Sequence, residues 1–270
     1  PLNKYPPLFL LLLLKRRVEQ STLGLLLSRR SIRRFRKTAM GEDVLSMVVE
    51  AGQSAPAYLQ AYSIIWVSDE KLVEQTASIC ESENVRQASA VLLVCLDLNR
   101  LAAFLQSVVP DNFLKFDTYP AEVLLSVFET GLVVENMIIA CEALGYGSLL
   151  LDCGVMECEK FVELFKLPQG VIPLVVLLIG EKDENPPPRP RWDIKNILHI
   201  DSYKPVSHAD VKEYLVTVEK TLASEGYLMK YAGFGGSYAE YLAERMKVTK
   251  EIRQSYEQLS AYLRKRGVKV

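Results

Sequence analysis

Residues 121–144 constrain the fold more than any other part of the chain, because they read as one helix that is apolar nearly all round. Hydrophobic side chains fall on every side of it, among them Val123, Phe128, Val133 and Ile138. Such a helix needs apolar cover around its whole circumference. We expect it to lie at the centre of the protein, with one side covered by a second copy of the chain.

The same stretch contains three acids, Glu129, Glu135 and Glu142. Each acid at membrane depth would cost on the order of 2.5–3.5 kcal/mol. The sequence therefore predicts a buried helix of a soluble protein rather than a membrane span, and no membrane partner.

A second apolar run, Leu8 to Leu14, lies near the start of the sequence. It provides about a third of the ~20 residues that a membrane span needs. Basic residues follow it from Lys15, where a signal peptide has small residues and a cleavage site. Residues 1–19 are interpreted as an N-terminal extension, with a docking helix as the alternative.

Four short apolar runs, rich in β-branched residues, predict strands at 61–67, 90–96, 147–151 and 173–179. Helical patterns lie between or beside them, at 42–53, 70–80, 121–144 and 155–166. The pattern is typical of an α/β or α+β protein with a largely buried sheet. A polar, proline-rich segment after Gly180 divides the chain into a core, 20–182, and a tail, 183–270. The tail is expected to hold an extended arm, a glycine-rich flap and one clear helix at 249–266.

The overall charge is close to neutral, but the basic residues are concentrated at the two ends. The chain has 32 Lys and Arg against 33 acids, 49% hydrophobic residues and a mean hydropathy of +0.09. These values are typical of a soluble globular protein. A nucleic-acid-binding protein usually spreads basic residues over a face, whereas here ten of the first forty residues are Lys or Arg, with a compact cluster at 28–37. We expect no nucleic-acid partner.

The five cysteines form no CxxC pair, and the chain has only two histidines. A zinc site is therefore not expected. An odd number of cysteines without a framework of close spacings favours a reducing compartment, and we expect a cytoplasmic protein.

Arginines spaced two apart give the clearest chemical signal. Arg29, Ser31 and Arg33 would point to one side of an extended segment, so two guanidinium groups and a hydroxyl could converge on one phosphate. Arg189 and Arg191 repeat this spacing between prolines and could grip a phosphate bidentately. Each cluster taken alone is more often a solvated surface run. No constellation of acid, base and nucleophile accompanies them, so no catalytic residue is named and the chemistry is assigned to a cofactor.

Four ordered motifs together resemble the FMN-dependent nitroreductase family: SRRSIRRF at 28–35, APAYLQAYSIIWVSD at 55–69, ENMIIACEALGYGSLLL at 135–151 and FKLPQGVIPLVVLLIGEKDENPPPRPR at 165–191. The likeness extends over residues 20–266 and is greatest to the NADPH-dependent branch. That branch contains oxygen-insensitive nitroreductases and flavin reductases. The absence of a Rossmann GxGxxG loop agrees with FMN rather than a dinucleotide flavin.

The resemblance implies an α+β fold with a central, mostly antiparallel sheet flanked by helices, in an intertwined homodimer. It implies electron transfer from NAD(P)H, through bound FMN, to nitroaromatics, quinones or free flavin by a ping-pong mechanism. An FMN-binding protein with little turnover, for storage or sensing, is the alternative. The cofactor-binding residues that it implies are Arg29, Arg30, Ser31, Arg33, Ala57, Tyr58, Gln60, Gly147, Ser148, Arg189 and Arg191; no metal is expected.

Two departures from the family pattern are visible. The small polar run that the family has before Gln60 is here Ala55 to Tyr58, which lacks its hydroxyl contacts to flavin. In the NADPH-dependent branch, tail arginines contact the 2′-phosphate of NADPH. The matching segment, 225–241, contains no arginine and a single lysine, Lys230, so weak discrimination between NADPH and NADH is expected.

Overall fold

The computed structural model describes residues 21–109, 120–247 and 249–268. They form two compact units: residues 21–109, 120–186 and 256–268 belong to the first, and residues 187–247 and 249–255 belong to the second. The N-terminal extension expected at 1–19 lies outside the described residues.

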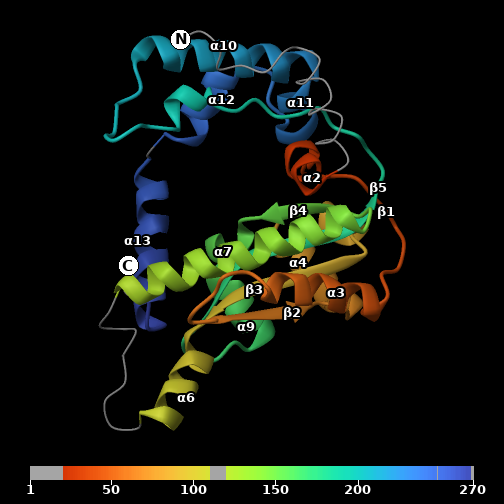
Figure 1. The fold of residues 1–270 in the computed structure, drawn as a ribbon, viewed down its shortest axis with the longest axis vertical. Coiled ribbons are helices and arrows are strands. Elements are labelled where there is room, and N and C mark those ends of the chain that lie inside the picture. Colours follow the sequence, from red (N-terminus) through yellow and green to blue (C-terminus); the bar gives the residue numbers. More distant parts are fainter. Residues whose placement is uncertain (1–20, 110–119, 248, 269–270) are drawn as a thin grey trace, which may run out of the picture. The chain divides into compact units, whose positions relative to one another are not determined.

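A five-stranded sheet is the centre of the first unit (Figure 1). Its strands are β1 (Phe35–Arg36), β2 (Tyr62–Trp66), β3 (Ala90–Asp97), β4 (Gly147–Leu151) and β5 (Val171–Lys182). β5 pairs antiparallel with β1, β3 and β4, and β3 pairs antiparallel with β2. Every residue of β3 is buried, which explains why its sequence is a continuous apolar run rather than an alternating one.

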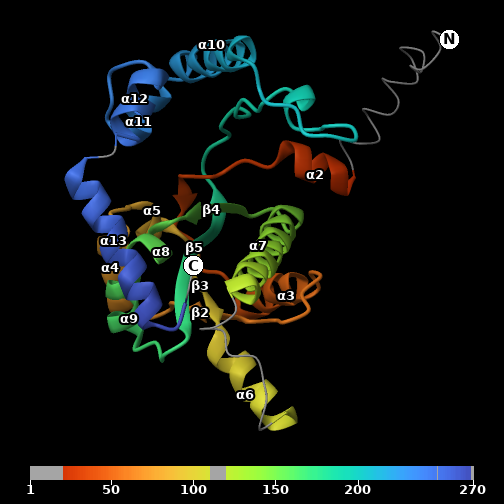
Figure 2. The same ribbon diagram turned by 90° about the vertical axis from the view of Figure 1, so that its left-hand side faces the viewer.

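Helices cover both faces of this sheet (Figure 2). On one face α7 (Pro120–Ala143) packs against α3 (Glu42–Gln53). A Cβ at Gly52 would lie only 2.6 Å from Met137 Cγ, so a glycine there allows the two helices to approach closely. The other face carries α4 (Glu70–Ile79), α8 (Cys153–Met156) and α9 (Cys158–Phe165). The remaining helices of the unit are α2 (Thr22–Ser28), α5 (Asn84–Gln87) and α6 (Leu98–Val108), and the C-terminal part of α13 (Lys250–Lys265).

The long apolar helix is a core element, as the sequence predicts. By length and composition α7 is the one helix of the described chain that could cross a membrane, and 44% of its apolar window is buried within the protein. Its acids Glu129 and Glu142 are buried as well. Both carboxylates have protein partners, so the helix belongs to a packed interior rather than to lipid.

The predicted strands and the helices at 42–53 and 70–80 are confirmed to within a few residues. The single helix expected at 155–166 is two helices, α8 and α9, because Glu157 between them leaves helical geometry at φ −109° and ψ 35°.

The helix expected at 249–266 is confirmed as α13, but it is not the only helix of the tail. The second unit contains a 3₁₀ turn at Ile194–Asn196, α10 (His208–Ser224), α11 (Tyr227–Ala232) and α12 (Tyr238–Arg245). Serines cap the starts of α10 and α12, with a reciprocal capping box at Ser237 and Glu240. Gly226 and Gly233, with φ of 59° and 63°, bracket α11. α11 and α12 have too few turns for a clear apolar period, and along the 17 residues of α10 only Val218 and Leu222 are buried.

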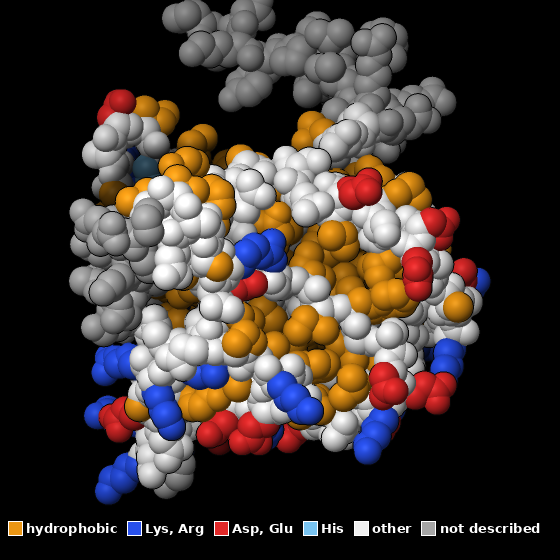
Figure 3. Space-filling model, turned by 90° about the horizontal axis from the view of Figure 1, so that it is seen from below, with side chains coloured by type: hydrophobic (Ala, Val, Ile, Leu, Met, Phe, Trp, Pro, Cys, Tyr) orange, Lys and Arg blue, Asp and Glu red, His pale blue; other side chains and the backbone are white. Residues whose placement is uncertain are grey.

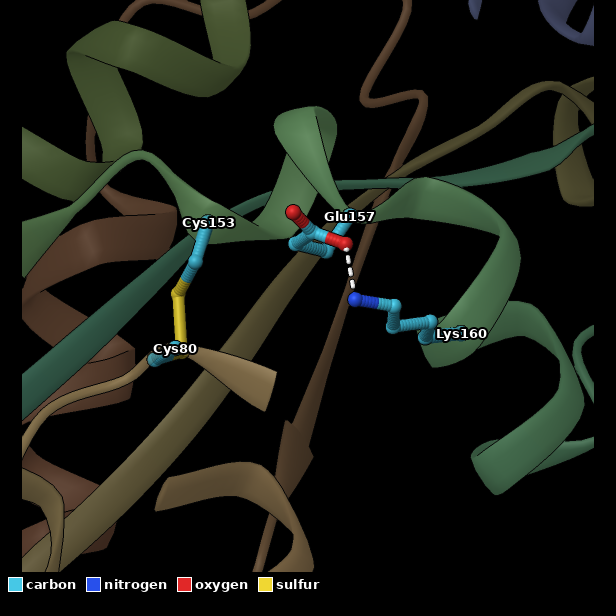
Figure 4. The surroundings of a disulfide bond; sticks show 4 residues. All are labelled: Cys80, Cys153, Glu157 and Lys160. Atoms are coloured by element: carbon cyan, nitrogen blue, oxygen red, sulfur yellow. Dashed lines mark ion pairs between the residues drawn. A yellow bond between two sulfur atoms is a disulfide. The ribbon is translucent and has the colours of Figure 1, made fainter. Parts of the chain in front are cut away.

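A disulfide joins Cys80, just after α4, to Cys153 at the start of α8 (Figure 4). The two residues are 73 positions apart in the sequence, with Cα atoms 5.2 Å apart. Nearby, Lys160 forms a 2.6 Å ion pair with Glu157. The disulfide disagrees with the reducing compartment that the cysteine pattern favoured, because disulfides persist mainly in oxidising environments. The pairing was not visible in the sequence, since two cysteines 73 positions apart have no characteristic spacing. Cys95, Cys141 and Cys158 are free and buried.

Candidate functional site

Two of the sequence-predicted segments lie side by side in the first unit. The N-terminal basic segment leaves α2 at Arg29, whose N–H caps the helix by donating to the Leu25 carbonyl at 2.9 Å. Ser31 then pairs with Ser148 as a parallel bridge, and the Ile32 N–H donates to the Ser148 carbonyl at 2.9 Å. The segment at 29–33 is therefore fixed against the first residues of β4.

Gly147 makes this approach possible. A Cβ there would lie 2.6 Å from Cγ1 of Ile32 and 2.9 Å from Cγ of Lys182. Any side chain would push the basic segment away from β4. The glycine that the family resemblance selected thus has a clear packing reason in this chain.

The arginines of this segment have different surroundings. Arg30 donates to the carbonyls of Leu27 (3.1 Å) and Arg29 (2.8 Å). Arg33 donates through its backbone N–H to Glu184 at 2.5 Å and through its guanidinium to the Ser31 carbonyl at 3.4 Å. Arg29 makes no side-chain ion pair or hydrogen bond with another described residue, so its charge is available to an anionic ligand.

The loop at 57–60, between α3 and β2, is held by a different contact. The backbone N–H groups of Tyr58, Leu59 and Gln60 donate to the carboxylate of Glu129 on α7. The Tyr58 side chain is 92% exposed, and Gln60 has a positive φ of 47°. Sequence reasoning missed Glu129, although an acid within an otherwise apolar helix is the signal that could have indicated it.

The Tyr62 phenol follows this loop at the start of β2. Burial raises the pKa of Tyr62; the nearby Arg100 lowers that pKa and the Glu129 carboxylate raises it further. The negative charge of Glu129 therefore acts on Tyr62, just beyond the loop, as well as on the loop itself.

The two tail arginines lie in the second unit and do not face the same groups. Arg189 forms a 2.6 Å ion pair with Glu225 and lies over the Tyr227 ring at 4.1 Å. Arg191 is exposed and lines a cavity of about 190 Å³ whose wall includes three acids, Asp193, Asp210 and Glu213. Their expected role in holding the FMN phosphate stays a prediction.

The residues around β4 fit a phosphorylated cofactor. Arg29 supplies a guanidinium without a described partner, and Ser31 supplies a half-buried hydroxyl next to the backbone of Gly147 and Ser148. A cation beside hydroxyl and amide groups is the donor set that phosphate prefers. Among the described residues, no group of three or more His, Cys, Asp or Glu is placed to hold a metal ion.

Comparison with protein families decides the assignment. The protein-family model described as the nitroreductase family matches residues 26–181 of this chain, which include the basic segment, the loop at 57–60 and β4. The chain belongs to the nitroreductase family. The resemblance drawn from the ordered motifs is confirmed, and so are the α+β fold class and the expectation of an oxidoreductase.

Individual relatives of this nitroreductase-family chain agree with the assignment. An NADPH-dependent oxidoreductase from Staphylococcus aureus is 29% identical over 197 residues, which cover 70% of this chain and 78% of the relative. The solved NfrA1 nitroreductase from Bacillus subtilis is 25% identical, with a TM-score of 0.76 and 92% and 98% of the two chains covered. The NADPH:FMN oxidoreductase from Vibrio harveyi, solved with NAD+, shares the fold at 22% identity and a TM-score of 0.74, with 92% and 99% of the two chains covered.

Proposed function

We propose that this nitroreductase-family chain is a flavoprotein that transfers electrons from NAD(P)H through FMN to nitroaromatics, quinones or free flavin by a ping-pong mechanism. The observation that carries the proposal is the fixed contact between Ser31 and Ser148, which holds a cationic segment against the start of β4. Family membership supports it, as do the activities named for the S. aureus and V. harveyi proteins.

Bound FMN would supply the hydride-accepting ring and the electron transfer to the acceptor. In this proposal Arg29, Arg30 and Ser31 hold the phosphate and ribityl chain, with Arg189 and Arg191 as further phosphate ligands. Reduction of a flavin places negative charge on the pyrimidine side of its ring. A fixed cation stabilises such developing charge, and this is the role proposed for Arg33.

The other named residues would orient the ring. Gly147 and Ser148 present backbone at the start of β4, where the glycine allows close approach. Ala57, Tyr58 and Gln60 would contact the ring from the loop, with Tyr58 available to cover it because its side chain is exposed. These assignments follow the family motifs position by position.

We further propose that two copies of the chain form a homodimer through α7. Apolar side chains on this helix remain exposed in the single chain, with Leu124 at 62%, Leu125 at 55% and Phe128 at 64%. Hydrophobic side chains also gather over a broad area of the face seen from below (Figure 3). An apolar helix side of this kind is expected to be covered by a protein partner.

One experiment separates the two candidate functions. The purified protein should be yellow, and acid release followed by chromatography should identify FMN. Anaerobic addition of NADPH or NADH should bleach the colour, and a quinone should restore it. A protein that binds FMN without bleaching would be the storage or sensing protein, and a protein without FMN would contradict both.

A further inference from the structure

The carboxylate of Glu129 binds three consecutive backbone amides. It accepts hydrogen bonds from Tyr58 at 2.8 Å, from Leu59 at 3.0 Å and from Gln60 at 3.2 Å. Glu129 is only 9% exposed and lies on the buried side of α7. Hydrogen bonds to an ionised acceptor are roughly twice as strong as those between neutral groups, so this contact is a major restraint on the loop.

The side chains of Ala57 and Leu59 pack against the core, but among the described residues Glu129 is the hydrogen-bond partner of the loop amides. Residues 55–57 are Ala-Pro-Ala, which have no side-chain donor or acceptor. Gln60 has a φ of 47°, in the left-handed region that residues other than glycine rarely adopt. Successive N–H groups that converge on one anion require such an unusual turn. The buried carboxylate thus stabilises a backbone conformation that the loop sequence alone disfavours.

We propose that Glu129 is the positioning residue of the flavin-binding loop, an inference that rests on the proposed function. It does not act as a ligand of the cofactor, because its carboxylate faces the amides of 58–60 from α7. It acts through the loop, since fixing three amides on one side directs the Tyr58 side chain to the other, solvent-facing side. Tight binding of FMN then requires the charge of Glu129, which keeps the loop preformed.

The test uses the whole chain of 270 residues with three separate substitutions on the same helix. Glu129→Gln keeps the size of the side chain and removes its charge, and Glu129→Asp keeps the charge on a shorter stem. Glu135→Gln removes an exposed acid and is the matched control. Hydrogen exchange of the peptide spanning 57–60 is measured in the flavin-free protein. The dissociation constant for FMN and the visible circular dichroism of the saturated protein are measured well below the melting temperature.

We expect Glu129→Gln to accelerate exchange of the loop amides, to change the visible dichroism and to weaken FMN binding about tenfold or more, equivalent to ~1.4 kcal/mol. Glu129→Asp should recover part of each change, and Glu135→Gln should match the wild type. If Glu129→Gln does not fold, Glu129→Asp is compared with Glu135→Gln by the same measurements. Glu129→Asp should then show faster exchange of the loop amides and weaker FMN binding than Glu135→Gln.

Unchanged exchange and unchanged FMN affinity in the Glu129 variants would overturn the inference. A lower melting temperature with unchanged affinity and dichroism would also overturn it, because Glu129 would then be a stability residue only. If the wild type binds no FMN, the proposed function fails, while the exchange experiment still reports whether Glu129 fixes the loop.

Discussion

Lys182, the last residue of β5, places its ammonium nitrogen 2.5 Å from a carboxylate oxygen of Glu142 near the end of α7. The Glu142 side chain is 6% exposed and that of Lys182 is 35% exposed. The other carboxylate oxygen of Glu142 is buried without a hydrogen bond to a described residue. The pair joins α7 to β5, the strand that lies beside Gly147. Loss of the pair would therefore also affect the surroundings of the candidate site.

Lys182→Met should destabilise the protein, because it leaves the buried Glu142 carboxylate without its cation. Losing one partner of a buried pair costs about 3–5 kcal/mol, and the partial exposure of Lys182 reduces the expected loss to roughly 1–3 kcal/mol. Unfolding in denaturant measures this loss in the free energy of unfolding. The double variant Lys182→Met with Glu142→Gln should regain most of the loss, and a double variant as unstable as the single one would show that the pair is not the cause.

Arg29→Ala should weaken FMN binding while the fold persists. One charge-assisted hydrogen bond is worth about 1.5–3 kcal/mol, which corresponds to an affinity roughly 10-fold to 150-fold lower. Arg36→Ala is the matched control, because Arg36 forms an exposed ion pair with Asp183. If the Arg29 variant retains FMN on dialysis as well as the control does, Arg29 is a solvated surface residue and not a ligand of FMN.

Reduction of the Cys80–Cys153 disulfide should lower the melting temperature. A cross-link that closes a loop of this kind typically contributes about 2–4 kcal/mol. Dithiothreitol should therefore destabilise the wild type and leave a Cys80→Ser, Cys153→Ser double variant unaffected.

Thiol counting gives an independent test of the same pairing. Burial raises the pKa of Cys95 and of Cys141 to about 12 and that of Cys158 to about 11. The native protein at pH 8 should show almost no reactive thiol. Three of the five cysteines should react in denaturant, and all five after reduction; five reactive thiols without reductant would contradict the disulfide.

Phe128→Glu should prevent association of two chains, because a charge on the exposed apolar side of α7 would be desolvated at the proposed interface. Light scattering at micromolar concentration should give twice the chain mass for the wild type and the single-chain mass for this variant. Met156→Glu, which changes an exposed methionine on the opposite face of the sheet, should remain dimeric. A wild-type protein that is monomeric with FMN bound would refute the dimer.

The ratio of kcat/KM for NADPH and NADH should be modest. The segment 225–241 has no arginine, and Lys230 lies over the Tyr231 ring at 4.6 Å. A lone lysine cannot reproduce the bidentate grip of an arginine fork on a 2′-phosphate. With one common quinone at low salt, a preference for NADPH above roughly 100-fold, or about 2.7 kcal/mol, would show that another group, such as Arg245 or Lys247, supplies the fork.

The sequence by itself determined four of the five strands, the central helix and the family, but not the two-residue strand β1. β3 and α7 were predictable because their apolar patterns are long and lack competing turn residues. The ordered motifs also name Arg29, Ser31 and Gly147 as cofactor-binding residues, and this role stays a prediction. In these segments local composition and final structure agree.

Only the tertiary structure decided the contacts between residues distant in sequence. The pairing of Cys80 with Cys153, the ion pair of Lys182 with Glu142 and the three amides bound by Glu129 each join separate elements. The tail helices α10 and α12 likewise depend on caps and packing rather than on apolar period. Sequence patterns report periodicity along one element, whereas these features arise when folding brings one element against another and buries a charge that must find its partner.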